Sequence, residues 1–242
     1  MKLVRFTKEN DDNVYHGTLE GEKVHDEQGS SFSLSEVQLL APTDPSKIIC
    51  AALNYKDHAE ESNEELPERP SLFFKPPSAV IGPGENIVLP DSERVDYEGE
   101  IGVVIGEECR DVSSEGAESV ILGYTCFNDV SDRDNQFNEQ NWVRGKGFDT
   151  SAPIGPVILT QGEVEGDLTI TTRVNGEVKQ NSDSSYLIFT IPELIEEISS
   201  IMTLEEGDVI ATGTPAGVGP LSPGDVVEIE IDGVGVLENP VV

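Results

Sequence analysis

Apolar and polar residues alternate over short segments along most of the chain, which is typical of strands with one buried face. The segments that this pattern predicts to be extended are residues 2–7, 14–24, 72–75, 94–106, 123–127, 168–180, 209–212 and 226–231. Two of them read as hairpins, one turning at Glu20-Gly21-Glu22 and the other at Asn175-Gly176, a dipeptide typical of tight hairpin turns. The pattern therefore predicts many short strands, several of them joined by tight turns.

Helical periodicity is confined to a few places. Residues 54–62 and 117–122 are predicted to be short helices, and a longer one begins at Thr190, where Glu193 completes a capping box. The apolar face of this longer helix consists of Ile191, Leu194, Ile195, Ile198 and Ile201. The proline-rich stretch 67–90 is predicted to be mostly ordered loop, and residues 234–242 a tail.

The predicted fold class is mainly β with a few helices, an α+β arrangement. With 242 residues, the chain is long enough for one domain with a small appendage. Pro42 and Pro45 mark a boundary between the first strands and the denser apolar segments that follow. We therefore predict a small N-terminal β module over residues 1–45 and a larger domain over residues 46–242.

The charge of the chain limits the kinds of molecule that it can bind. It has 15 Lys and Arg against 47 Asp and Glu, a net charge of −32, and the acidic residues are spread over the whole sequence. Such a surface repels nucleic acid. We interpret the bias as halophilic adaptation, because molar salt screens charges beyond about 3 Å. The alternative is an unusually acidic protein from an ordinary ionic environment.

Cysteine usage and hydropathy predict a cytoplasmic protein. Cys50, Cys109 and Cys126 are odd in number and far apart, so neither a disulfide framework nor a zinc site is expected, and we predict three buried thiols in a reducing compartment. No apolar stretch reaches the roughly 18 residues of a membrane span, and the charged opening lacks the apolar region of a signal peptide. We expect a soluble protein that does not contact membranes.

An acidic cluster is the first candidate for chemistry. On a strand, Asp96, Glu98 and Glu100 point to one face, and Asp129 follows another apolar strand. Crowded carboxylates repel one another unless a cation lies between them, and an all-oxygen set suits magnesium, manganese or calcium. The alternative, a solvated acidic strand face, is weakened by the apolar residues 101–105 that follow at once.

Two further groups of polar residues accompany this cluster. On a helix, His58 and Glu61 share a face, so the carboxylate can orient the imidazole as a general base, although an ordinary surface pair would have the same spacing. Lys75, Arg133, Arg144 and Lys146 are scarce cations, which either compensate the acidic cluster or bind an anionic substrate. The glycine-rich segment 212–219 matches no phosphate-binding motif and is interpreted as a turn.

Taken together, these segments resemble the fumarylacetoacetate hydrolase family from about Lys47 to the end of the chain. The strings that carry the resemblance, in order, are Asn54-Tyr55 with His58 and Glu61, Phe74-Lys75-Pro76, Asp96-Tyr97-Glu98-Gly99-Glu100, Gly123-Tyr124-Thr125, Asn128-Asp129-Val130-Ser131, Arg133-Asp134, Lys146-Gly147-Phe148-Asp149 and Thr212-Gly213-Thr214-Pro215. The short N-terminal module resembles the compact branch, which includes acylpyruvate hydrolases, oxaloacetate decarboxylases and diene-dioate isomerases. Asp132 departs from the family pattern, where a small residue is more common.

The resemblance implies a β-sandwich roll, assembled as a homodimer, with a metal site and a substrate site. It implies Mg²⁺ or Mn²⁺, with Ca²⁺ as a substitute, bound by the residues that match the family's ligands, which are Glu98, Glu100 and Asp129. It also implies substrate contacts from Lys146 and Thr214, with Arg133 and Gln136 nearby, and we add Lys75 as a further substrate contact. His58 and Glu61 match a catalytic dyad on a lid.

The predicted function is cleavage of a carbon–carbon bond in a small anionic 2-oxo acid, by acylpyruvate hydrolysis or oxaloacetate decarboxylation through an enolate held by the metal. Lys146 would balance charge, and His58 would activate water. Alternatives that use the same site are isomerisation of 2-hydroxyhepta-2,4-diene-1,7-dioate and dehydration of a 2-oxo-3-deoxy sugar acid. A non-enzymatic alternative is an acidic calcium-binding module.

Overall fold

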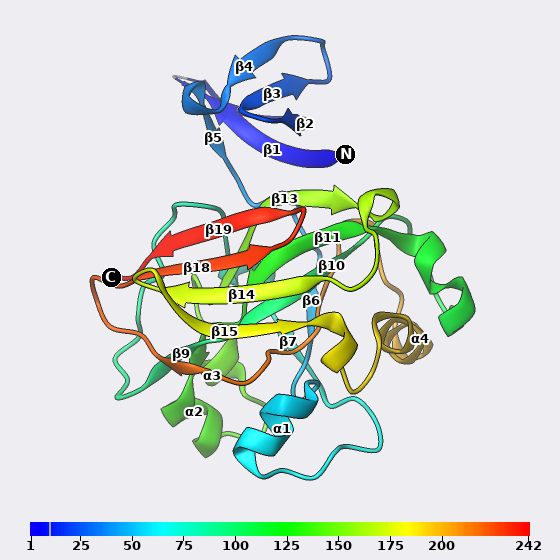
Figure 1. Ribbon diagram of the computed structural model, residues 1–242, viewed down its shortest axis with the longest axis vertical. Coiled ribbons are helices and arrows are strands. Elements are labelled where there is room, and N and C mark those ends of the chain that lie inside the picture. The colour runs from blue at the N-terminus through cyan, green and yellow to red at the C-terminus, as the bar shows by residue number, and fades with distance from the viewer. Residues whose placement is uncertain (10) are drawn as a thin grey trace.

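The computed structural model describes residues 1–9 and 11–242. The core of the molecule consists of β-sheets that pack face to face, and helices α1, α2 and α3 gather at one end of the larger body (Figure 1). The predicted fold class, mainly β with a few helices, is confirmed. The N-terminal strands stand at the opposite end from these helices (Figure 1).

The largest sheet has twelve strands and runs from the N-terminal strands into the centre of the molecule. Its order is β4-β3-β2-β1-β13-β11-β10-β16-β6-β7, with β5 paired to β1 and β8 paired to β13. Their bounds are β1 Lys2–Lys8, β2 Asp11–Glu20, β3 Lys23–Asp26, β4 Ser31–Ser33, β5 Val37–Leu39, β6 Ile48–Ala51, β7 Leu72–Lys75, β8 Val80–Ile81, β10 Gly99–Ile105, β11 Ile121–Asn128, β13 Ala152–Thr160 and β16 Val209–Ala211. Because β1 pairs with β13, the N-terminal strands extend the central sheet.

A second sheet has four strands in the order β15-β14-β18-β19 and lies in front of the large sheet in Figure 1. Their bounds are β14 Thr169–Val174, β15 Glu177–Asp183, β18 Val226–Ile231 and β19 Gly235–Pro240. Burial alternates along β18, and its inward side chains join the core with those of β10, as Ile229 and Val103 illustrate. This two-layer packing buries one face of each sheet.

The remaining elements are short. A three-stranded sheet consists of β12 (Ser131–Asp132), β9 (Val95–Tyr97) and β17 (Gly219–Pro220). The α-helices are α1 (Lys56–Ser62), α2 (Arg133–Asn138), α3 (Val143–Lys146) and α4 (Ile191–Ile201), and the 3₁₀ helices are η1 (Leu34–Glu36), η2 (Pro77–Ala79), η3 (Ser114–Val120), η4 (Gln161–Glu163) and η5 (Ser184–Tyr186). At the start of α4, Thr190 and Glu193 form the predicted capping box.

Several predicted elements differ from the structure. The helix expected at 117–122 is the end of η3, because Ile121 pairs with Ile105 and begins β11. The tail expected at 234–242 contains β19, which pairs with β18 along its length. Strand β13 was not predicted, because it is buried along almost its whole length and so lacks the alternation of a half-exposed strand. Helices α2 and α3 were also not predicted, since one or two turns are too short to show a period.

The three cysteines are free and buried, as predicted. Burial raises the pKa of the Cys126 thiol to about 12, which keeps it protonated and unreactive. Among the helices of the described residues, none combines the length and the apolar character needed to cross a membrane.

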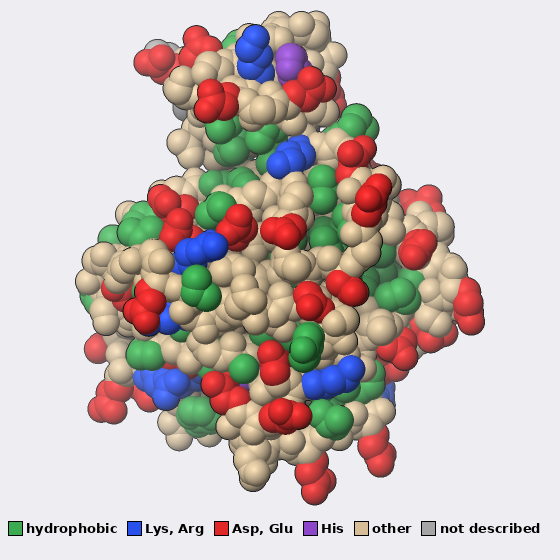
Figure 2. All heavy atoms as spheres, viewed as in Figure 1, with side chains coloured by type: hydrophobic (Ala, Val, Ile, Leu, Met, Phe, Trp, Pro, Cys, Tyr) green, Lys and Arg blue, Asp and Glu red, His purple; other side chains and the backbone are tan. Residues whose placement is uncertain are grey.

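Salt is predicted to stabilise this fold. Asp and Glu side chains are scattered over the visible face, on the N-terminal strands and on the main body alike (Figure 2). The net charge is −32, so acidic side chains in the folded state repel one another, and dissolved salt screens this repulsion. We expect the thermal unfolding midpoint to rise by several degrees between about 0.1 M and about 2 M KCl, measured by circular dichroism. A midpoint that does not move over this range would contradict halophilic adaptation.

Candidate functional site

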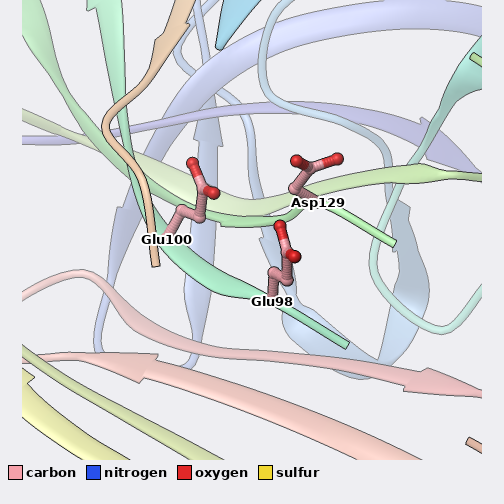
Figure 3. Close-up of side chains that lie close together, drawn as sticks. All are labelled: Glu98, Glu100 and Asp129. Carbon is pink, nitrogen blue, oxygen red and sulfur yellow. The ribbon is translucent and has the colours of Figure 1, made fainter. Parts of the chain in front are cut away.

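Three buried carboxylates lie together where two neighbouring strands meet. Glu98 connects β9 to β10, Glu100 lies in β10, and Asp129 directly follows β11. Strands β10 and β11 are antiparallel, and the pairing of Gly99 with Asn128 brings the acidic residues of both strands to one place. One carboxylate oxygen from each residue lies within 4.8 Å of one from each of the other two, and the side chains converge in Figure 3.

Backbone contacts fix this arrangement. The Asp129 N–H donates to the Glu98 carbonyl at 2.9 Å, and the Gly213 N–H donates to Glu100 Oε2 at 2.8 Å. Gly99 has no room for a side chain, because a Cβ there would lie 2.0 Å from Thr172 Oγ1. The glycine between the two glutamates therefore allows β14 to approach closely.

The electrostatics of the cluster favour a bound cation. Burial raises the pKa of Glu100 well above its ordinary value, and the nearby Asp129 and Glu98 charges raise it further. Burial also raises the pKa of Glu98, but the positive charges of Lys146 and Arg133 together have the larger effect. The pKa of that carboxyl is therefore lowered. A divalent cation would relieve the repulsion, and three carboxylate oxygens this close suit a hard ion such as Mg²⁺ or Mn²⁺.

Two buried lysines neutralise part of this charge. Lys146 Nζ lies 2.7 Å from Glu98 Oε2, 2.5 Å from Asp129 Oδ2 and 2.6 Å from Ser131 Oγ, so all three ammonium donors are used. Lys75 Nζ lies 2.5 Å from Asp129 Oδ1 and 3.2 Å from the Val130 carbonyl. The Lys75 side chain is fully buried and does not line the cavity described below, so its contact with substrate stays a prediction.

Two arginines bind Asp96, which lies beside the three clustered carboxylates. Arg133 Nε binds Asp96 Oδ2 at 2.7 Å, while its other two nitrogens bind Glu98 Oε1 at 2.5 Å and Gln136 Oε1 at 2.7 Å. Arg94 binds the same Asp96 through Nε and Nη2, at 2.8 and 3.0 Å. Asp96 is therefore a bridge that orients the guanidinium of Arg133 toward Glu98.

A cavity of about 360 Å³ opens over this network. Glu98 is the one of the three clustered acids that lines it, since Glu100 and Asp129 lie deeper. The other polar or charged side chains in its wall are His58, Ser62, Glu64, Arg94, Asp96, Arg133, Gln136, Lys146 and Thr214. Phe73, Phe137 and Trp142 add aromatic surface. The cavity has the size and the mixed lining of a site for a small ligand.

Helix α1 brings the histidine to this cavity. His58 Nδ1 lies 3.5 Å from Glu61 Oε2, an ion-pair distance that exceeds a good hydrogen bond. Glu61 Oε2 also accepts from the Gly217 N–H at 3.1 Å, which ties α1 to the glycine-rich segment after β16. The two residues predicted as a dyad therefore lie side by side, with His58 facing the cavity and Glu61 outside its lining.

The hydroxyl of Thr214 is held by a residue that the sequence did not identify. Gln180, buried in β15, donates to Thr214 Oγ1 at 2.8 Å, and Thr214 donates in turn to the Gly99 carbonyl at 2.8 Å. Gln180 is one polar residue in an ordinary hairpin, so its position gave no signal.

Arg94 could have been noticed as another scarce cation, two residues before Asp96. Of the scarce cations, Arg144 pairs instead with Glu139, an exposed contact outside the cavity lining.

Comparisons with known proteins identify the family of the chain. Residues 47–242 match the profile of the fumarylacetoacetate (FAA) hydrolase C-terminal domain, and residues 1–42 match the Rv2993c-like N-terminal profile. The oxaloacetate tautomerase YisK of Bacillus subtilis is 43% identical, over 98% of this chain and 85% of its own.

Solved structures of family members are similar over the whole chain, as two of them illustrate. A 5-carboxymethyl-2-hydroxymuconate delta-isomerase from Mycobacterium smegmatis is 44% identical with a TM-score of 0.92, covering 100% of this chain and 98% of its own. A maleylpyruvate hydrolase from Sphingobium, solved with manganese(II) and pyruvate, is 30% identical with a TM-score of 0.86, covering 100% and 99%. The chain therefore belongs to the fumarylacetoacetate hydrolase family, in its compact branch.

Proposed function

We propose that this protein is an enzyme that uses a divalent cation to move a proton on a small 2-oxo dicarboxylic acid, interconverting its keto and enol forms. The observation that carries the proposal is that a single small cavity is lined by an imidazole, His58, by the cations Arg133 and Lys146, and by Glu98 of the acidic cluster. Relatives that cover nearly the whole chain are named a tautomerase and an isomerase. Both names describe relocation of a proton and not bond cleavage.

The roles of the side chains follow from their positions. A cation held by Glu98, Glu100 and Asp129 would act as a Lewis acid toward the 2-oxo group. Gln136, Lys146 and Thr214 line the same cavity; the Gln136 amide N–H would donate to the carboxylate next to that group, the positive charge of Lys146 would attract it, and Thr214 would border it. His58 would take a proton from C3 as the electron pair shifts toward the 2-oxo oxygen, and would deliver it there. Glu61, 3.5 Å from Nδ1, would stabilise the imidazolium.

The test is an assay of the enol form of oxaloacetate by its ultraviolet absorbance, with Mn²⁺ or Mg²⁺ in high salt. We expect the protein to accelerate loss of the enol, and His58→Ala to reduce the rate by about 100-fold or more. Affinity for Mn²⁺ should be unchanged, because His58 makes no contact with the acidic cluster in the described structure. His16→Ala, in β2 and outside the cavity, is the matched control.

A His58→Ala variant with full activity would remove the imidazole from the mechanism. Wild-type protein that binds Mn²⁺ yet leaves the enol unchanged would refute the tautomerase proposal. The same reaction mixtures should then be analysed by mass spectrometry for other products.

Cleavage of a carbon–carbon bond is the second candidate. Its support is the similarity to the maleylpyruvate hydrolase with bound pyruvate, together with the His58 and Glu61 pair, which could activate water. Release of pyruvate from oxaloacetate or from an acylpyruvate, measured with lactate dehydrogenase, would favour this reaction. Product analysis also distinguishes diene-dioate isomerisation and sugar-acid dehydration. The lined cavity and the enzyme relatives favour any of these over a calcium-binding module.

The two predicted parts of the chain have separate proposed roles. We propose that residues 1–45 are a β module that extends the central sheet and that residues 46–242 carry the catalytic site. The family profiles meet near this boundary, at residues 42 and 47, which supports the division. Assembly as a homodimer in the cytoplasm stays a prediction, to be tested by light scattering and by localisation.

A further inference from the structure

The charges that surround the cavity favour a substrate with two negative charges. Four buried carboxylates lie beneath it, namely Asp96, Glu98, Glu100 and Asp129. Four cations lie among them, namely Lys75, Arg94, Arg133 and Lys146, and within the described residues these cations bond to every one of the four carboxylates except Glu100. Four against four gives zero, so a bound divalent cation would leave this network with a net charge of +2; Glu64, the acid in the cavity wall, is exposed to solvent that screens it and is not part of the network. A dicarboxylate would balance that charge, whereas a monocarboxylate would leave a net charge of +1.

The hydrogen bonds show which cation is available for a second carboxylate. Lys146 uses its three donors on Glu98, Asp129 and Ser131, and each of the three nitrogens of Arg133 already binds a side-chain oxygen. Arg94 differs, because only its Nε and Nη2 are engaged, both by Asp96. Within the described part of the chain, no group accepts a hydrogen bond from its Nη1.

The position of Arg94 suits this role. Its side chain lines the cavity and is 53% exposed, whereas Arg133 is 12% exposed and Lys146 is 3% exposed. Arg94 is therefore at the outer rim, and Asp96, which it shares with Arg133, fixes its direction. Glu64 is the exposed acid in the same wall and would repel an anion that lacked a cation beside it.

We propose that Arg94 determines substrate specificity by binding the distal carboxylate of a dicarboxylic substrate. That carboxylate would lie at the outer rim of the cavity, whereas the acidic cluster lies deep beneath it. This assignment rests on the proposed function for the class of substrate, but it concerns recognition and not the reaction. The free Nη1 and the adjacent edge of the guanidinium offer a charge-assisted hydrogen bond to a carboxylate.

Binding of unreactive acids tests the assignment separately from turnover. Malate and lactate share a 2-hydroxy acid head, and malate alone has the distal carboxylate. Titration calorimetry on the Mn²⁺-loaded protein should show malate binding about tenfold or more tighter than lactate. Arg94→Gln should remove this preference and leave lactate affinity unchanged, while Arg94→Lys should keep part of it because a cation remains.

Arg110→Gln is the matched control. Arg110 is 44% exposed and pairs with the adjacent Asp111, yet it lies outside the cavity, so both affinities should be unchanged. If Arg94→Gln weakens malate and lactate equally, Arg94 only supports Asp96 and Arg133, and the proposal is wrong. Equal affinities in the wild type would also refute it. Absence of oxaloacetate turnover with an intact malate preference would refute the proposed reaction and leave this assignment standing.

Discussion

Glu100→Gln is expected to abolish Mn²⁺ binding and activity while leaving the metal-free protein at least as stable as the wild type. Glu100 is buried in β10, and among the described residues no cation bonds to its carboxylate. Burial together with the charges of Asp129 and Glu98 raises its pKa. A raised pKa means that the ionised side chain destabilises the fold at neutral pH. Glutamine removes that charge and can still accept from the Gly213 N–H.

The measurements are Mn²⁺ titration by calorimetry and chemical denaturation with and without the metal. The wild type should gain stability from Mn²⁺, whereas Glu100→Gln should gain none, because one anionic ligand is lost. Glu118→Gln, an exposed glutamate in η3, is the control and should behave like the wild type. Full Mn²⁺ affinity in Glu100→Gln would show that this residue is not a metal ligand.

Lys146→Met is expected to destabilise the metal-free protein by about 3–5 kcal/mol, because it removes one partner from a buried ionic network. The ammonium neutralises Glu98 and Asp129 together, and both carboxylates are buried. Mn²⁺ should restore most of the loss because its positive charge compensates the same carboxylates. Activity should still fall by about 1,000-fold, since the restored protein lacks the ammonium charge that would attract the substrate carboxylate.

Urea denaturation with and without Mn²⁺ and the enol assay measure these effects. Lys179→Met, a partly exposed lysine paired with Glu177, is the control and should change stability by less than about 0.5 kcal/mol. Unchanged metal-free stability in Lys146→Met would contradict the neutralising role. Activity recovered with Mn²⁺ would contradict a role in binding substrate.

Local sequence patterns predicted the strands and helices that have one buried face and one exposed face, and the tight turns between strands. The hairpin turn at Asn175-Gly176 requires two residues with positive φ, and both have it, at 52° and 78°. The amphipathic helix after Thr190 begins at the predicted cap. Strand β13 was missed because it is buried on both faces, and β19 because its pairing with β18 is a contact between segments and not a local pattern.

By itself, the sequence determined the β-rich class, the capped helix, the main hairpins and the acidic residues that could form a metal site. These depend on side-chain alternation, turn chemistry and charge, which are local properties of the chain. Only the tertiary structure decided which cations meet those acids. Lys75, Arg133 and Lys146 reach them from β7, α2 and α3, and Gln180 reaches Thr214 from β15. Such contacts join residues distant in the chain, so they depend on how the sheets pack and on which buried donors remain to be satisfied.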